Sequence, residues 1–531
     1  MAAGGRGEGL ATLAVLGWSA LLWRQRWGCR PETLAALLLA CELWVLEQRR
    51  TRPAPAPLLR DSAWLLVPLQ IVWINVHVSY YLGLVVAAAF LLDGCWKAAR
   101  GASAAAPRYL ALILVCATAA CLINPFGVRA VWQPFDFFLH GRYERIFQVV
   151  DELQPIDWSD NLRNGLPLYL LGFLALAAWR WRRIGFDAAQ AVIMAVLLPQ
   201  ALSTNRFLGF LAVAIVPSFA RDAESAAAQP GIRRIARSPW ARVTVFMLPI
   251  VTLSYLEFTR LAPPFSLGVR WDRVPVRACD FMLDHDVHGR GYNMFWQGGY
   301  LLWRFWPEHG RLPFIDIHQT GTRTDRDLQV LSQRDSSAWR ALDDRYRFDW
   351  VLLPTHQGPT QHLLDQLDAE KARWALVFTD DVACLFVRKD GTGAGIAAQT
   401  GYRDLRLGAV HFRELGERAL RDTTLRSPLE SQLDRAVASS PWNSRALALR
   451  ASLGLMERRW DDARRDLEAA LAVAPDLNAG HDWLAYALVM EGEPARALTE
   501  IERARRWGMS PVQADDLTRR ARAMLASAPR H

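Results

Sequence analysis

The residues of this chain that are best suited to chemistry are an acidic pair, Asp151–Glu152, and two arginines, Arg30 and Arg206. A carboxylate can act as a general base that activates a hydroxyl group. An arginine guanidinium offers a planar fork of donors that can bind a phosphate through two hydrogen bonds. We therefore predict that the two acids are catalytic and that the two arginines bind a substrate phosphate. The alternative interpretation is that the acids are solvated loop residues and that the arginines reach from an apolar surface to water.

Three more polar residues stand inside or beside apolar runs. Asn75 and His77 interrupt the apolar stretch 62–93, and Glu32 belongs to an R-P-E motif at 30–32 that opens an earlier run. Polar side chains are costly against lipid, so they should face a protein interior or water. We predict Glu32, Asn75 and His77 as substrate-binding residues. For His77 the alternative is a helix-end residue that is hydrogen-bonded to Asn75.

Apolar runs that fill the first half of the chain must position these residues. Hydrophobic residues make up 52% of the sequence, yet the mean hydropathy is only +0.04 because the second half is charged. A straight membrane span needs about 20 apolar residues, and stretch 62–93 is long enough for two short spans. We interpret nine runs as spans, which are 10–23, 33–46, 62–76, 78–92, 107–123, 165–179, 188–203, 206–219 and 241–258.

Basic loops predict the orientation of these spans. Cytoplasmic loops of membrane proteins carry an excess of Lys and Arg, and four loops do so here, at 47–61, 97–108, 180–183 and 221–242. With these loops inside, the N-terminus is cytoplasmic and the chain after residue 260 is periplasmic. One loop, with Arg24, Arg26 and Arg30, disagrees. All the predicted site residues then lie on the outer side, together with an aromatic and acidic loop, 126–164, that is typical of an interfacial segment.

Composition excludes some other classes. The formal net charge of +9 and the 23 tryptophans fit a membrane protein with basic loops and interfacial aromatics. The arginines stand beside apolar runs rather than on one polar face, so we predict no nucleic-acid partner. The seven cysteines have no metal-binding spacing, so no metal site is predicted.

Four short motifs together resemble the GT-C class of polytopic glycosyltransferases. They are R-P-E at 30–32, W-x-N-x-H at 73–77, N-P-F-G at 124–127 and N-R at 205–206. The resemblance covers residues 25–390 and is closest to bacterial relatives of protein O-mannosyltransferases and aminoarabinose transferases. It implies transfer of a sugar from a polyprenyl-phosphate carrier at the outer face of the membrane, with that lipid-linked sugar as donor. In the family the catalytic acid usually lies in the first outer loop, whereas this chain joins the pattern near Arg30. The resemblance therefore implies a shortened N-terminus or a branch that has lost this acid.

The segment 274–390 changes character and predicts a small α/β domain. Helical patterns occupy 276–286, 324–345 and 359–372, while β-branched and aromatic runs predict strands at 291–305, 312–318, 348–354 and 374–388. We interpret Gly298–Gly299 as a strand bulge and Asp380–Asp381 as a hairpin turn. Cys279 and Cys384 could pair if the compartment is oxidising, although the sequence does not reveal their geometry. The run 293–300 is also similar to the outer soluble domain of many GT-C-like proteins.

A 34-residue period marks the C-terminal segment from about residue 427. Small residues and prolines recur at this spacing, as Ala451/Ala485, Ala463/Ala497, Ala470/Ala504 and Pro441/Pro475. This is the period of the tetratricopeptide repeat, whose paired helices close over small residues. Such repeats bind proteins, so we predict a protein partner for residues 427–531; the alternative is a helical cap on the preceding domain.

The sequence thus predicts a mostly α, multi-pass protein of the bacterial inner membrane. Its predicted domains are a polytopic transmembrane domain (1–260), an extracytoplasmic α/β domain (261–395) and a tetratricopeptide-like α-solenoid (396–531). The expected function is that of a lipid-linked sugar transferase in contact with membrane lipid. The alternative is a non-catalytic membrane scaffold that recruits partners for envelope assembly. A transporter is a weaker option, because the spans show no internal repeat.

Overall fold

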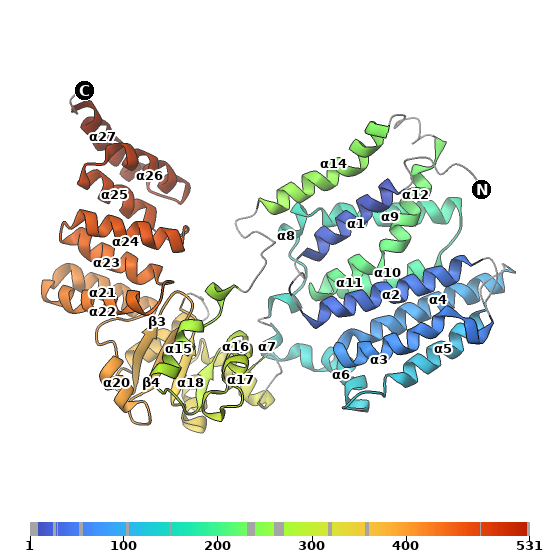
Figure 1. Ribbon diagram of the computed structural model, residues 1–531, viewed down its shortest axis with the longest axis horizontal. Coiled ribbons are helices and arrows are strands. Elements are labelled where there is room, and N and C mark those ends of the chain that lie inside the picture. Colours follow the sequence, from blue (N-terminus) through green and yellow to red (C-terminus); the bar gives the residue numbers. More distant parts are fainter. Residues whose placement is uncertain are drawn as a thin grey trace. The chain divides into compact units, whose positions relative to one another are not determined.

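The computed structural model divides into two compact units, residues 1–267 and 268–531 (Figure 1). Both units are predominantly helical, which confirms the mostly α prediction. The predicted domain boundary at 260/261 lies outside the described residues. The structure describes residues 9–24, 28, 30–52, 57–101, 106–148, 150–230, 239–259, 270–316, 321–355, 360–477 and 479–527.

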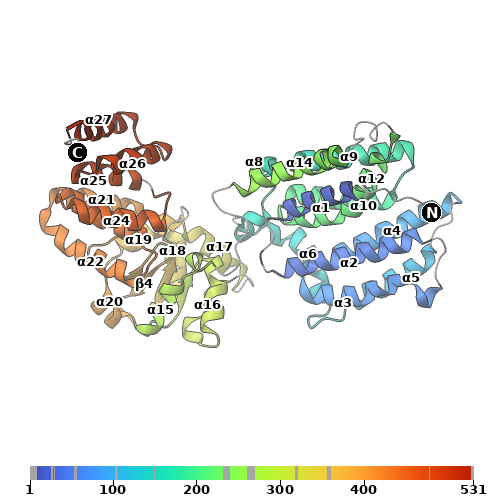
Figure 2. The ribbon, with the colours of Figure 1, turned by 45° about the horizontal axis from the view of Figure 1, so that its top comes forward.

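The first unit is a bundle of helices around one apolar core in its described residues. Helices α2, α3, α4 and α5 pack against one another, and α11 joins α2 to α1 and α10 (Figures 1 and 2). The helices are α1 (Leu10–Trp23), α2 (Pro31–Thr51), α3 (Leu66–Val76), α4 (Tyr81–Ala99), α5 (Pro107–Ala120), α6 (Val128–Leu139), α7 (Arg145–Gln148), α8 (Trp158–Arg163), α9 (Leu166–Arg183), α10 (Ala188–Ser203), α11 (Arg206–Ala214), α12 (Val216–Ala227) and α14 (Pro239–Phe258). The 3₁₀ turns η3 (Ser62–Leu65) and η4 (Val78–Tyr80) lead directly into α3 and α4.

The prediction of a polytopic transmembrane domain with about nine spans is wrong. Among the described residues, one helix, Val78–Ala99, is long and apolar enough to cross a membrane. Five other apolar helices contain only 10–17 residues, fewer than the roughly 20 that a span needs. Several apolar runs therefore end too early. The run 206–219, for example, breaks at Ile215 into α11 and α12.

The basic loops also have a structural explanation, because several of their arginines form ion pairs with buried acids. Arg49 forms a buried ion pair with Asp61, with Nε 2.9 Å from Oδ2. Arg50 and Arg221 both contact Asp187, at 3.0 and 2.9 Å. Arginines that are neutralised by buried acids stabilise helix packing, so their presence in a loop says little about which side of a membrane the loop occupies.

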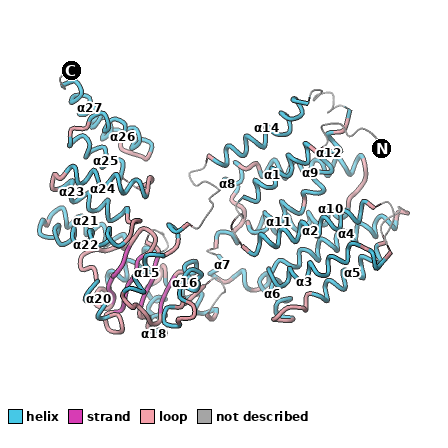
Figure 3. The backbone as a smooth tube through the Cα atoms, viewed as in Figure 1, coloured by secondary structure: helices cyan, strands magenta, loops and turns pink. Residues whose placement is uncertain are grey.

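The second unit contains a four-stranded sheet with strand order β1-β2-β4-β3 (Figure 3). β1 (Gly291–Asn293) is parallel to β2 (Trp350–Leu353), whereas β4 (Cys384–Arg388) is antiparallel to both β2 and β3 (Trp374–Thr379). The predicted strands at 348–354 and 374–388 are confirmed, and so is the hairpin turn at Asp380–Asp381. The surrounding helices are α15 (Val276–Asp284), α16 (Gly298–Phe305), α17 (Arg323–Ser332), α18 (Ser336–Tyr346), α19 (Gln361–Ala369) and α20 (Ala394–Thr400).

Side chains alternate between two cores on the two faces of this sheet. Trp350, Leu352 and Leu385 pack with α15 and α16, and Val351 and Phe386 pack with α18 and α19. Period-2 alternation of this kind is what a strand with helices on both faces requires. Cys279 lies in the first core and Cys384 in the second, and both are free thiols.

The strand predictions at 291–305 and 312–318 are wrong over most of their described length. After β1 the chain turns through η8 (Phe295–Gln297) into α16, so Gly298–Gly299 opens a helix and forms no strand bulge. A Cβ on Gly298 would lie 2.2 Å from the Ile315 carbonyl oxygen, so glycine is needed for close packing. Residues 312–316 form no strand, and Ile317–His318 lie outside the described residues.

Antiparallel helices complete the second unit. Equivalent buried positions recur every 34 residues, as Leu433, Leu467 and Ile501, and as Ala436, Ala470 and Ala504, all at most 1% exposed. The tetratricopeptide assignment of this array stays a prediction. The helices are α21 (Ala409–Arg421), α22 (Arg426–Ser439), α23 (Ser444–Met456), α24 (Trp460–Val473), α25 (Gly480–Glu491), α26 (Pro494–Arg506) and α27 (Pro511–Ser527).

Acids of the sheet region cap the helices of this array. Asp381, in the β3–β4 turn, accepts hydrogen bonds from the backbone N–H of Ser444 (2.6 Å) and Arg445 (3.4 Å) at the start of α23. Asp365, on α19, does the same for Val410 at the start of α21 (2.9 Å). A helix N-terminus has unpaired N–H groups, and a carboxylate stabilises it through hydrogen bonds and the helix dipole. These caps therefore fix the array to the sheet.

We expect Asp381→Ala to lower the free energy of local opening of α23 by about 1–2 kcal/mol, the usual cost of a lost cap. The measurement is amide hydrogen exchange of residues 440–456 in the full chain. Asp344→Ala is the control, because Asp344 is exposed on α18. Equal exchange rates in the two variants would contradict the capping role.

Candidate functional site

Five of the seven predicted site residues form one connected cluster in the first unit. The Arg206 guanidinium contacts the Glu32 carboxylate, and its Nη2 lies 3.3 Å from Glu152 Oε1. Arg30 Nη1 donates a hydrogen bond to Glu152 Oε2 at 2.6 Å. His77 Nε2 lies 3.7 Å from Glu32 Oε1. The chain therefore brings together residues that are up to 176 positions apart in sequence.

Helix ends position the members of this cluster. Arg30 and Glu32 flank the proline that begins α2, and Arg206 is the first residue of α11. His77 follows the last residue of α3. Glu152 is held beside Arg206 because the Asn205 N–H donates to the Gln154 carbonyl at 2.8 Å. Two helix N-termini with positive dipole ends thus carry the two arginines, and such termini favour bound anions.

The two carboxylates of the cluster differ in burial. The side chain of Glu32 is 5% exposed, whereas that of Glu152 is 23% exposed. Arg206 and Arg30 are 30% and 54% exposed. Glu32 therefore lies at the inner end of the cluster, and Glu152 and Arg30 lie at the rim, where a solute can reach them.

The hydrogen bonds of His77 determine its tautomer. Nδ1 accepts from the Ser79 N–H at 3.2 Å and lies 2.7 Å from the Ser79 hydroxyl. In neutral imidazole one nitrogen accepts and the other carries the proton, so the proton lies on Nε2, which faces Glu32. The ring also packs against Phe210, with centroids 6.2 Å apart. His77 thus caps η4 through Ser79, and the predicted alternative contact with Asn75 is absent from its hydrogen bonds in the described structure.

Burial and the positive charge of Arg206 lower the pKa of His77 to about 4, although Glu32 and Glu152 oppose this shift. The ordinary value is 6.5. His77 is therefore neutral at physiological pH. The cluster then contains two cations and two anions that neutralise each other.

Asp151 and Asn75, which were predicted beside these residues, lie elsewhere. Asp151 is exposed at the start of the turn η6 (Asp151–Leu153). Asn75 is exposed, and its amide donates to the carbonyls of Ile71 and Ile123, both at 2.8 Å. Asn75 thus ties the end of α3 to the turn that follows α5. The structure places neither residue in the cluster.

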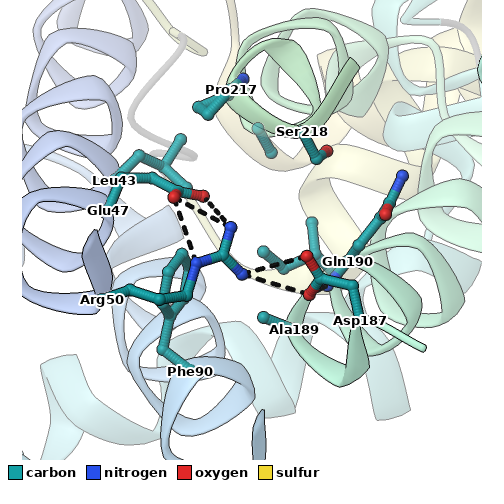
Figure 4. A pocket seen from close by; sticks show the side chains of 11 residues that line it. Leu43, Glu47, Arg50, Phe90, Asp187, Ala189, Gln190, Pro217 and Ser218 are labelled. Carbon is teal, nitrogen blue, oxygen red and sulfur yellow. Dashed lines mark hydrogen bonds and ion pairs between the residues drawn. The ribbon is translucent and has the colours of Figure 1, made fainter. Parts of the chain in front are cut away.

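Arg50 and Asp187 belong to a second polar cluster that the sequence analysis did not predict (Figure 4). Arg50 bridges Glu47 (2.7 Å) and Asp187 (3.0 Å) and lies 5.0 Å from the centroid of the Phe90 ring. Asp187 also accepts from the Gln190 N–H at the start of α10 (3.1 Å). The basic character of loop 47–61 was the one sequence signal that pointed to this second cluster. The cavity beside this cluster measures about 10 Å³, room for about one water molecule, so the cluster is structural.

The chemistry of the first cluster is that of an anion site with an adjacent base. Arg30 and Arg206 can form charge-assisted hydrogen bonds to a phosphate, if the carboxylates that now bind them move aside or exchange partners. Glu32 can accept a proton from a hydroxyl group. In the described residues no group of three or more His, Cys, Asp or Glu side chains is arranged to hold a metal ion.

Comparisons with known proteins do not add a family to these observations. No protein-family model matches the chain, and no curated protein matches it either. The resemblance to GT-C enzymes therefore rests on the motifs alone and stays a prediction.

We expect the free energy of unfolding to fall as the pH drops from 6.5 to 4. We also expect that His77→Gln removes part of this fall. The folded-state pKa of His77 is lower than the unfolded-state value, so the unfolded state binds more protons in this window. The contribution of His77 is at most about 3 kcal/mol. The measurement is the melting temperature at pH 7 and at pH 4.5. His140→Gln, at an exposed site on the same unit, should keep the wild-type pH dependence. A His77→Gln variant with that dependence would refute the assignment.

We expect Asp187→Asn to destabilise the first unit by about 3 kcal/mol, because removal of one partner leaves buried charge uncompensated. Burial would raise the pKa of Asp187, but Arg50 and Arg221 outweigh it and hold the pKa below its ordinary value. The wild-type contribution is therefore present at neutral pH and is lost on acidification below about pH 4. Thermal melting at pH 7 measures the loss, with Asp136→Asn as an exposed control. Similar melting of both variants would disprove the structural role.

Proposed function

We propose that this protein transfers a sugar from a polyprenyl-phosphate carrier to an acceptor hydroxyl at the Arg30–Glu32–His77–Glu152–Arg206 cluster. The observation that carries the proposal is that two arginines at helix N-termini converge on Glu152, and that one of them, Arg206, also contacts the buried carboxylate of Glu32. A glycosyl phosphate needs this combination, because negative charge grows on the leaving phosphate while the acceptor loses a proton.

In the proposed reaction, the acceptor oxygen attacks the anomeric carbon and gives its proton to a carboxylate. The bond between this carbon and the phosphate oxygen breaks, and the polyprenyl phosphate leaves with the bonding electron pair. Arg30 and Arg206 stabilise that charge. Glu32 is the better base of the two acids in the cluster, because it is the more buried one and lies beside the neutral His77, with Nε2 3.7 Å from Oε1. Glu152 then acts at the rim, where it holds the arginines until a phosphate replaces it.

The surface of the first unit supports association with a membrane. Large apolar side chains are exposed on several helices, among them Leu37 and Trp44 on α2, Val115 on α5, Leu171 on α9 and Val251 on α14. Contiguous exposed apolar surface marks sites of interaction with proteins or membranes, and we propose that these side chains contact lipid. A lipid phase accommodates such surface, and Val78–Ala99 is long enough to anchor the unit in it.

We expect Glu32→Gln to reduce transfer about 10²–10⁴-fold, the usual contribution of a general base. Arg206→Lys should reduce it about 10²-fold or more, because a lysine cannot replace a bidentate guanidinium. The measurement is turnover of a radiolabelled polyprenyl-phosphate sugar by the full chain in membranes. Asp151→Asn, at the exposed neighbour, should retain wild-type turnover. Loss of turnover in the Asp151 variant alone, with full activity of Glu32→Gln, would move the base to Asp151.

The second candidate function is a scaffold that binds a protein partner through the C-terminal helices. A hollow of about 120 Å³ favours it, formed where the α24–α25 and α26–α27 turns meet and lined by Asp476, His481, Asp482 and Trp507. A scaffold would lose its cellular function on Trp507→Ala and keep it on Glu32→Gln. The enzyme proposal expects the opposite result, so the two variants discriminate between these functions.

A further inference from the structure

Three tryptophans are exposed within eleven residues of the second unit. Trp296, Trp303 and Trp306 are 43%, 69% and 66% exposed. Tyr300 lies beside Trp303, with ring centroids 5.6 Å apart. We name these four residues the aromatic stripe. None of the strand predictions indicated it, because alternation in a strand would have divided these residues between two faces.

The aromatic stripe follows from the helical geometry of η8 and α16. Tyr300 and Trp303 are spaced i, i+3 on α16, so they share one helix face. Trp296 lies in the preceding turn η8, and Trp306 directly follows α16. The opposite face buries Leu301 and Phe305 in the core against the sheet.

Arginines accompany the aromatic stripe. Arg304 lies on α16, and its Nη2 is 3.2 Å from Asp280 on α15. Arg277 approaches the same carboxylate at 3.5 Å. Arg273 is also exposed just before α15. Arg304 and Arg277 share Asp280, and Arg273 is exposed just before α15, so these four residues carry a net charge of +2, which complements an anionic layer.

We propose that the aromatic stripe and its arginines dock on the headgroup layer of an anionic membrane. Indole and phenol rings prefer this layer because one end is apolar and the other end forms hydrogen bonds. Arginines bind lipid phosphates in the same layer. The ten residues between Thr259 and Arg270 span at most about 40 Å, so the chain keeps this surface within reach of a membrane that binds the first unit. The inference rests on the membrane association in the proposed function.

The test is photo-crosslinking in the full chain with benzoylphenylalanine at position 303. The protein is placed in vesicles of phosphatidylethanolamine and phosphatidylglycerol, and adducts are identified by mass spectrometry. The matched control carries the same group in place of Leu420, which is 59% exposed on α21. We expect lipid adducts at 303, background levels at 420, and a clear decrease at 303 in vesicles of phosphatidylcholine alone.

Flotation of the same vesicles distinguishes membrane association of the whole protein from docking of the aromatic stripe. Protein that floats but forms no lipid adduct at 303, or forms an adduct with protein instead, overturns the docking of the stripe and leaves the proposed function intact. Protein that does not float overturns both. A Trp303→Glu/Trp306→Glu variant gives a second readout: it should float, yet lose the protection from hydrogen exchange that vesicles give to residues 296–306.

Discussion

The first unit depends on the guanidinium of Arg206, which two carboxylates share. Glu32 comes from the start of α2, and Glu152 comes from the segment that precedes α8. Through this contact, helices that are far apart in sequence meet at one charged point. Arg30, which also binds Glu152, brings the cluster to two positive and two negative charges, and this balance permits the burial of Glu32. Glu152 and Arg30 stay partly exposed. A substrate with its own negative charge can therefore compete with Glu152 more easily than with Glu32.

The sequence was informative where burial of a polar or charged side chain is costly and so restricts where that residue can lie. The nine-span topology predicted that Arg30, Glu32, His77, Glu152 and Arg206 lie on one side of a membrane, and the structure brings these five residues together although that topology is wrong. Which of two consecutive acids faces the cluster depends on the backbone angles of a short turn, and sequence does not reveal them. The prediction that Asn75 lies in the cluster is wrong for a related reason. Asn75 lies within α3, whereas His77 lies just beyond the end of this helix. The 34-residue period could be recognised in the sequence because closely packed helices accept only small residues at their contact positions.

The failures have a common origin in local patterns that fit two structures. An apolar run of 14 residues is equally suitable for a short span and for a helix in a protein core, and the structure ends most of these runs before a bilayer's thickness is reached. The run 291–305 has the composition of a strand, yet after β1 it forms η8 and α16, with Gly298 packed closely against the Ile315 carbonyl. Tertiary packing decided both cases.

The shared core of the sheet and the first array helices has a mechanical consequence. Leu429, Leu433 and Leu453 belong to the same core as Tyr292 and Phe386. Cooperative opening units often coincide with elements that share a core, so we expect these helices and strands to open together. A force that acts on α22 or α23 would therefore reach the strands directly through these shared core contacts. The later helices of the array pack mainly in a separate core. We expect them to deform under load before the helices that share the core of the sheet.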